Sequence, residues 1–380
     1  MEFSREHEEL RAQVRASVQE EINPHADTWE EAGEFPAREL LSKLGERGFL
    51  GLSYPQAFGG REQDYGHNVV FLEELGQADS GGVALGIAVH TDMATPALAS
   101  FGSDELKERF LAPAIQGKMV AAVAVTEPHA GSDVMAIRTQ AETDGDHYLI
   151  NGTKRFITNG SQADWFCLLA RTRPDSGLRG MSLIIVPSNL AGVTVVKRMQ
   201  KVGNWASDTA ELSFENVRVP HSYRIGQEGM GFLLQMRQFQ RERLAIAIMG
   251  SAAIKKHLSL TIQYLKKREA FGQPLIKNQR LHLRLAELLA ENELLHQMTH
   301  HCAQQLQAGK DVTKESAVAK WKAGTLARIV ADTCMQFHGG QGYLAETPVA
   351  RFYRDAPLFS IGGGTDEIML GIIAKYGRLV

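Results

Sequence analysis

The chain has 380 residues, of which 44% are hydrophobic, a composition typical of a folded protein with a substantial core. Its formal net charge of −3 provides no basic field for nucleic acid, and no apolar run approaches the roughly 20 residues of a membrane span. Three cysteines without CxxC spacing favour a reducing compartment, so we expect a cytoplasmic protein with no nucleic-acid partner and no membrane span.

The spacing of apolar residues divides the chain into three regions. Residues 1–119 repeat apolar positions every three or four residues, which predicts an N-terminal α-helical domain. Residues 120–225 alternate apolar and polar positions, which predicts a middle antiparallel β-barrel or sandwich with a turn at Asn151 and Gly152. Residues 226–380 return to the helical period, which predicts a C-terminal four-helix bundle and a multidomain α+β fold. The four bundle segments are 231–250, 255–271, 280–309 and 314–340.

Two motifs have weaker functional interpretations. Residues 340–345, GQGYLA, match the spacing of a dinucleotide-binding loop, but the residues before them predict a helix rather than a strand. A Rossmann site is therefore not expected. His296 and His300 are one helical turn apart, as in a metal pair, but no third ligand is evident nearby. We interpret them as part of a solvated helix face and predict no metal site.

Five turns rich in glycine, serine or threonine are the strongest candidates for chemistry. They are residues 124–133, 154–160, 267–279, 336–344 and 358–369. The first alone is explained equally well as a polar surface loop. Taken together and in order, the five resemble the acyl-CoA dehydrogenase family, flavoproteins that introduce an α,β double bond into acyl-CoA thioesters. The resemblance extends from about residue 1 to residue 375 and implies the helix, sheet, helix order of that fold.

The resemblance implies FAD as the cofactor, an acyl-CoA as the substrate and electron-transferring flavoprotein as the electron acceptor. It also implies a homotetramer, in which Arg268, Asn278, Gln279 and residues 336–340 approach the FAD of a neighbouring subunit. Phe156 stands where a tryptophan is more usual. The implied cofactor-binding residues are Val123, Ala124, Val125, Thr126, Gly131, Ser132, Phe156, Ile157, Thr158, Arg268, Phe271, Asn278, Gln279, Gln336, Phe337, His338, Gly339, Gly340, Thr365, Asp366 and Glu367.

The position of the catalytic base needs a separate argument. Many members of the family carry the catalytic glutamate where this chain has Gly363. The isovaleryl-CoA and long-chain subgroups place it instead on the first bundle helix, before Arg-Leu, and Glu242 occupies that position here. No cation lies three or four residues from Glu242, so the usual helical ion pair is missing, and an apolar surrounding would raise its pKa. We predict that Glu242 is the catalytic base. The predicted substrate-binding residues are Ser132, Phe239, Arg243, Gly362 and Gly363.

A narrower resemblance indicates the acyl group: the chain is similar to bacterial enzymes of the family that oxidise citronellyl-CoA in terpene breakdown. It is carried by residues 21–36, 81–115, 162–170, 223–232 and 361–370. A branched or terpenoid acyl-CoA is therefore predicted. A straight medium- or long-chain fatty acyl-CoA is the alternative, and a carrier-protein-bound acyl group remains open. Two other hypotheses remain: a flavin oxidase or monooxygenase, and a non-catalytic binding protein on the same scaffold.

Overall fold

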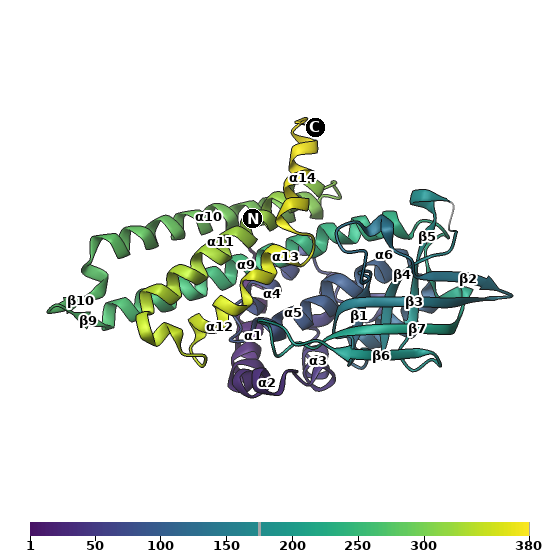
Figure 1. Ribbon diagram of the computed structural model, residues 1–380, viewed down its shortest axis with the longest axis horizontal. Helices are drawn as coiled ribbons and strands as arrows, with labels where there is room; N and C mark the ends of the chain where they lie inside the picture. Colours follow the sequence, from purple (N-terminus) through teal and green to yellow (C-terminus); the bar gives the residue numbers. More distant parts are fainter. Residues whose placement is uncertain (174–175, 380) are drawn as a thin grey trace.

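In the computed structural model, which describes residues 1–173 and 176–379, a β-sheet lies at one end of an elongated molecule. Three long helices extend from the middle of the molecule toward the other end, and shorter helices of the first third of the chain fill the space between (Figure 1). The predicted order of helices, sheet and helices is confirmed. Among the described helices, none combines the length and the apolar character needed to cross a lipid bilayer.

In the N-terminal region, α-helices are joined by short 3₁₀ and π turns and by irregular segments such as residues 60–64. Every residue of α4 is buried, because α1, α9 and α10 pack around it. The π-helical turn η5 packs on β1, where His90 Nδ1 accepts a hydrogen bond of 3.1 Å from the backbone of Ala121. The elements are α1 (Arg5–Ser17), α2 (Ala26–Ala32), α3 (Ala37–Glu46), α4 (Tyr65–Leu75), α5 (Gly81–Ala88), η5 (Val89–Ala94), α6 (Pro96–Phe101), α7 (Asp104–Leu106) and α8 (Ala112–Ile115).

The middle region forms one eight-stranded sheet with the order β6-β7-β3-β2-β4-β5-β8, in which β1 pairs in parallel with β4. The predicted β region is confirmed, but the sheet does not close into a barrel, since β6 and β8 remain its two ends in the described part of the chain. Most other neighbours are antiparallel. The strands are β1 (Ala121–Ala124), β2 (Gln140–Asp144), β3 (His147–Thr158), β4 (Trp165–Arg171), β5 (Met181–Pro187), β6 (Val193–Arg198), β7 (Thr209–Pro220) and β8 (Arg224–Ile225).

The turn predicted at Asn151 and Gly152 is wrong. Strand β3 passes through both residues, and the register against β7 shifts between Ile150 and Gly152, which marks a β-bulge. Asn151 Oδ1 accepts a hydrogen bond of 2.8 Å from the backbone of Asn216 on β7. Because the residues on both sides of the bulge pair with β7, the long-range pairing overrides the local preference of Asn-Gly for a turn.

The C-terminal region contains three long helices rather than four. The predicted segments 231–250 and 255–271 belong mainly to one continuous helix, α9. Gly250 does not end it: a Cβ atom on Gly250 would lie 3.3 Å from Ala323 Cβ and 3.3 Å from the ring of Phe359. The glycine therefore permits close packing of neighbouring helices. The elements are α9 (Gly231–Lys267), β9 (Glu269–Ala270), β10 (Gln273–Pro274), α10 (Gln279–Gln307), α11 (Thr313–His338), α12 (Pro348–Asp355), α13 (Pro357–Ile361) and α14 (Asp366–Tyr376).

Candidate active site

Glu242 lies on α9 with its carboxylate almost completely removed from solvent. The residue is 8% exposed, and its Oε2 atom is buried without a hydrogen-bond partner. Burial raises the pKa of Glu242 to about 7, although the positive charges of Arg243 and Lys320 oppose the shift. A carboxyl group with this pKa exchanges a proton readily near neutral pH.

The glycine turn after α13 lies directly against Glu242. Gly363 has φ +67°, a conformation that side chains rarely adopt. A Cβ atom on Gly363 would lie 2.6 Å from Ile246 Cδ1 and 3.4 Å from Glu242 Oε1. Both the backbone conformation and the close approach of Ile246 therefore favour glycine, which lets the turn pack directly against the Glu242 carboxylate.

Two cations hold the carbonyl groups of this turn. Arg243 Nε donates a hydrogen bond of 3.3 Å to the carbonyl oxygen of Gly363, and Lys320 Nζ donates to that of Gly364. The guanidinium of Arg243 also lies over the ring of Phe239, 5.6 Å from its centroid. The structure thus brings together the predicted residues Glu242, Phe239, Arg243 and Gly363. Lys320, which sequence reasoning missed, completes the group.

Lys320 is fully buried on α11, and burial lowers its pKa to about 8. The charges of Asp366, Glu242 and Glu367 oppose that shift, so the lysine balances several acidic groups around the turn. The only signal in the sequence is a lysine directly after the short apolar stretch from Ala317 to Ala319.

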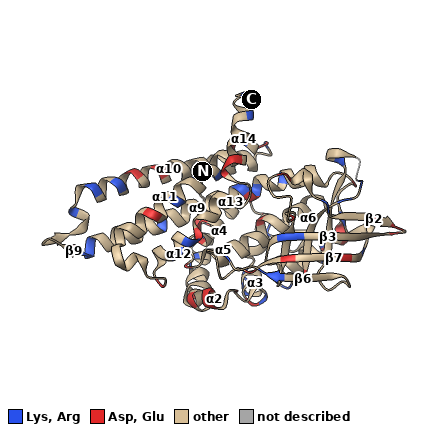
Figure 2. Cartoon of the chain, in the orientation of Figure 1, with Lys and Arg blue, Asp and Glu red and all other residues tan. Residues whose placement is uncertain are grey.

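The acidic residues Asp366 and Glu367 begin α14 (Figure 2). Thr365 is the N-cap of this helix, and its side chain accepts a hydrogen bond of 3.4 Å from the backbone of Ile368. Asp366 Oδ1 is buried without a partner. The acidic pair therefore sits in the first turn of a helix, where negative charge is favourable.

A buried ion pair holds the loop that follows β1 against β3. Lys154 Nζ on β3 lies 2.8 Å from Glu127 Oε1 and donates a second 2.8 Å hydrogen bond to the carbonyl oxygen of Val125. The backbone of Arg155 donates to the carbonyl oxygen of Thr126 at 2.8 Å. The predicted residues of β1 and its loop thus rest on β3. The Glu127–Lys154 pair was not recognised in the sequence.

The exposed surface formed by Phe156 and the loop after β1 is suited to a flat cofactor. Phe156 is 59% exposed, has φ +61°, and lies at a β-bulge while its neighbour Ile157 is buried. The guanidinium of Arg155 is 5.2 Å from the centroid of the Phe156 ring. Gly131, in the loop, has no atom within 4 Å of the place its Cβ would take, and Ser132 is exposed. An exposed aromatic ring and an open loop with a serine hydroxyl are suited to contact the flat isoalloxazine ring and its polar edge.

A second group of predicted residues lies far from Glu242. Arg268, Phe271 and Asn278 are exposed around the β9–β10 hairpin, at the end of the molecule opposite the sheet (Figure 1). Residues 336–340 lie near this end too, where Tyr264 Oη donates a hydrogen bond of 3.2 Å to the carbonyl oxygen of His338. Along α9, Glu242 and Arg268 are about 39 Å apart at ~1.5 Å per residue. One chain therefore does not unite all of the predicted cofactor residues.

The solvated helix face predicted for His296 and His300 is wrong for His300, whereas the His296 side chain is 32% exposed. His300 is 5% exposed, and its Nε2 atom lies 2.8 Å from Glu73 Oε1 on α4. Glu73 is the acidic neighbour that the sequence did not reveal, because it belongs to a helix from another region of the chain.

Models of the three domains of the acyl-CoA dehydrogenase family match the chain: the N-terminal domain at residues 4–118, the middle domain at residues 122–217 and the C-terminal domain at residues 229–377. The chain belongs to the acyl-CoA dehydrogenase family. The predicted family, fold class and enzyme class are confirmed, and this acyl-CoA dehydrogenase is a FAD-dependent oxidoreductase that acts on CH–CH bonds.

Relatives of this acyl-CoA dehydrogenase differ in their substrates. The mitochondrial long-chain specific acyl-CoA dehydrogenase of Sus scrofa is 38% identical over 98% of this chain and 86% of its own. The crystal structure of an acyl-CoA dehydrogenase from Geobacillus kaustophilus is 40% identical, covers 98% of both chains and has a TM-score of 0.95. The butyryl-CoA dehydrogenase of Megasphaera elsdenii is 30% identical, with a TM-score of 0.96 over 100% of this chain and 99% of its own.

Proposed function

We propose that this acyl-CoA dehydrogenase oxidises branched, terpenoid acyl-CoA thioesters of the citronellyl-CoA type, and that Glu242 is its catalytic base. The observation that carries the second part is the buried Glu242 carboxylate facing Gly363, with an unpartnered oxygen and a pKa of about 7. The turn itself offers no carboxylate at positions 362–364.

In the proposed reaction, an oxygen of Glu242 accepts the proton from the α-carbon of the thioester. Arg243 and Lys320 favour the ionised carboxylate that must be present before this transfer. Negative charge then develops on the thioester oxygen, and backbone N–H groups of the glycine turn are suited to donate to it. Because Arg243 and Lys320 fix the carbonyl groups of the same turn, they position these donors as well.

FAD, when bound, accepts the hydride from the β-carbon. Within one chain, the β1 loop and Phe156 would hold the flavin, and Thr365, Asp366 and Glu367 would lie over the dinucleotide. The residues around the β9–β10 hairpin and residues 336–340 would serve a neighbouring subunit of a homotetramer. Their exposure and their distance from Glu242 support that assignment. Electron-transferring flavoprotein is the proposed electron acceptor.

The proposed acyl group rests on the turn and on the sequence stretches that resemble citronellyl-CoA enzymes. A β-methyl branch needs room close to the reacting carbons, and the turn at Gly362 and Gly363 places no side chain of its own beside Glu242. A straight-chain fatty acyl-CoA is the second candidate, favoured by the 38% identity to the long-chain enzyme.

The test is anaerobic mixing of FAD-loaded enzyme with citronellyl-CoA, octanoyl-CoA or palmitoyl-CoA while the flavin absorbance is followed. Wild type is compared with Glu242→Gln and with Glu287→Gln, a control that removes a glutamate partner of Arg284 on α10. We expect rapid bleaching with citronellyl-CoA in wild type and in the control, but not in Glu242→Gln. Faster bleaching with a straight chain would reject the terpenoid substrate, and bleaching of Glu242→Gln at the wild-type rate would reject the base.

A further inference from the structure

Three potential metal ligands converge between α4 and α10, away from the active site. Glu73 Oε1 lies 2.8 Å from His300 Nε2 and 3.6 Å from His296 Nδ1. The ligand atoms of all three residues lie within 4.8 Å of one another. Donor atoms held tetrahedrally at about 2.0–2.2 Å from one Zn²⁺ lie roughly 3.3–3.6 Å apart, so these ligand atoms need only small shifts to surround an ion.

The carboxylate is oriented for this task by a neighbour. Arg11 Nη1 lies 2.7 Å from Glu73 Oε2, which leaves Oε1 directed at the two imidazoles. Arg11 also lies 3.3 Å from Glu74 Oε1, so its charge is shared between two carboxylates and does not cancel that of Glu73 alone. A ligating carboxylate is commonly held through its second oxygen in this way.

An ionised Glu73 suits metal binding, whereas His300 must move the Nε2 proton of its hydrogen bond to Glu73 before it can bind an ion. Burial would raise the pKa of Glu73, but hydrogen bonds from His300 and Arg11 outweigh it and hold the pKa below its ordinary value. Burial and the nearby His300 lower the pKa of His296, which keeps its imidazole neutral. An ionised carboxylate and a neutral imidazole are the forms that bind a metal ion.

We propose that Glu73, His296 and His300 form a binding site for a divalent transition-metal ion such as Zn²⁺, with a fourth position for water. Two imidazoles and a carboxylate are ligands that Zn²⁺ accepts. His300 must carry its ring proton on Nδ1, so the ion replaces its hydrogen bond to Glu73. The His296 side chain is 32% exposed whereas those of Glu73 and His300 are nearly buried, so the ion enters past His296. Once bound, it links α4 to α10.

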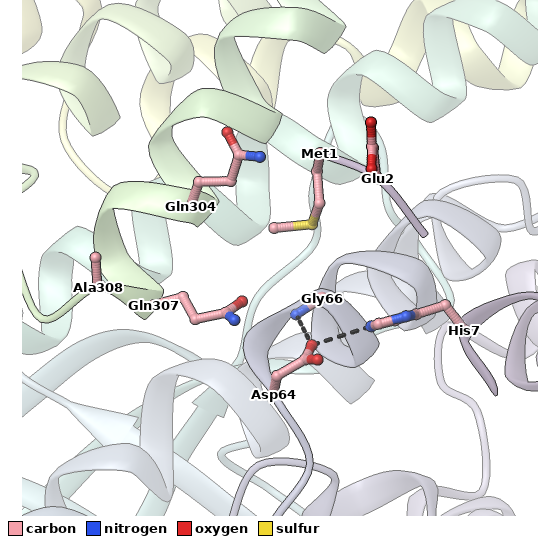
Figure 3. Close-up of a pocket in the computed structure, with 8 residues that line it drawn as sticks. All are labelled: Met1, Glu2, His7, Asp64, Gly66, Gln304, Gln307 and Ala308. Atoms are coloured by element: carbon pink, nitrogen blue, oxygen red, sulfur yellow. Dashed lines mark hydrogen bonds and ion pairs between the residues drawn. The ribbon is translucent and has the colours of Figure 1, made fainter. Parts of the chain in front are cut away.

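A second cluster of histidine and carboxylate side chains in the same chain can be compared with the first. His7 Nε2 and His67 Nδ1 lie 3.0 and 3.3 Å from Asp64 Oδ1. His7 and Asp64 line a cavity of about 350 Å³ (Figure 3). Here Asp64 is the N-cap of α4, and the same Oδ1 accepts a 2.7 Å hydrogen bond from the backbone of Gly66. The backbone of Ser4 donates to His7 Nδ1 at 3.1 Å, so Nε2 carries the proton. These atoms already form hydrogen bonds that stabilise the start of α4 and the segment before α1, so no ion is proposed there.

The test measures zinc bound to FAD-loaded enzyme that has been stripped with EDTA and dialysed against Zn²⁺. Wild type is compared with His296→Gln and with His301→Gln, which changes an exposed histidine of the same helix outside the cluster. His296 is only half-buried, so its variant is expected to fold; equal FAD content and an equal Tm without zinc check this.

We expect one zinc ion per chain in wild type and in His301→Gln, with a Tm that rises on zinc addition, and neither effect in His296→Gln. Wild-type enzyme that binds no zinc would overturn the proposal. So would undiminished binding by His296→Gln, or loss of zinc in a His67→Gln variant while His296→Gln retains it, because the ion would then occupy another place.

Discussion

Oε1 of Glu242 lies 3.4 Å from the place that a Cβ atom on Gly363 would occupy. The two residues belong to segments far apart in the sequence, yet they border the same small volume. A carboxylate on the helix and a side chain in the turn therefore compete for space. This competition explains why a chain with its acidic group on α9 carries glycine at this position of the turn.

The rate of flavin reduction should increase with pH through the pKa of the base. Glu242 must be ionised to accept a proton, and burial raises its pKa to about 7. The rate is therefore expected to be low at pH 5.5, half-maximal near pH 7 and level above pH 8, in anaerobic single-turnover measurements. In Glu242→Gln, the remaining rate should fall by about 10²–10⁴-fold and lose this pH dependence. A wild-type rate that does not change between pH 5.5 and 8 would contradict the assignment.

Removing the charge of Lys320 should move this profile to higher pH. Lys320 stabilises the ionised form of Glu242, so both Lys320→Met and Lys320→Gln are expected to raise the apparent pKa of the base. The two variants separate charge from hydrogen bonding, because only glutamine can still donate to the carbonyl of Gly364. A profile that shifts in Lys320→Met alone would mean that the hydrogen bond, and not the charge, sets the pKa.

Gly363→Ala should destabilise the enzyme by about 1–3 kcal/mol, because alanine would be forced into a positive φ and against Ile246. Gly371→Ala is the matched control: Gly371 lies on α14 with no atom within 4 Å of its Cβ position. There alanine should be neutral or stabilising by about 0.5–1 kcal/mol. Urea unfolding of both variants measures the difference. Equal stabilities would show that the turn adapts to a side chain.

Breaking the ion pair under the β1 loop should reduce both stability and FAD content. Lys154 and Glu127 are both almost fully buried, and Lys154→Met leaves the Glu127 carboxylate without its cation. Losing one partner of a buried pair costs about 3–5 kcal/mol. The double variant Lys154→Met/Glu127→Gln should recover part of this loss, since it removes the unpaired charge. The bound FAD per chain and the Tm are the two readouts; a double variant less stable than Lys154→Met would argue against a role for charge.

Much of the architecture was predictable because its signals are local. The change from helical to alternating spacing located the sheet, and the residues next to Glu242 on the helix pointed to an unpaired carboxylate. The helix break expected between 250 and 255 failed for a tertiary reason. A glycine such as Gly250 weakens a helix locally, but here Ala323 and Phe359 from other helices pack into the space that a side chain would occupy.

The surroundings of the candidate sites were the least predictable. Lys320 approaches Glu242 from α11, and Glu73 approaches His300 from α4, so neither pair has a sequence spacing that could be recognised. Local spacing identifies one participant in such a site. The partners come from helix packing, which places residues from different regions of the chain side by side.

The length of α9 has a genetic consequence. Glu242 lies on α9 and Arg268 directly follows the end of that unbroken helix, about 39 Å away. Substitutions of the two residues would therefore affect different active sites if Arg268 serves the FAD of a neighbouring subunit, as we propose. Co-expression of Glu242→Gln chains with Arg268→Ala chains would place both substitutions in some active sites and none in others. Such mixed assemblies would regain activity that neither parent possesses.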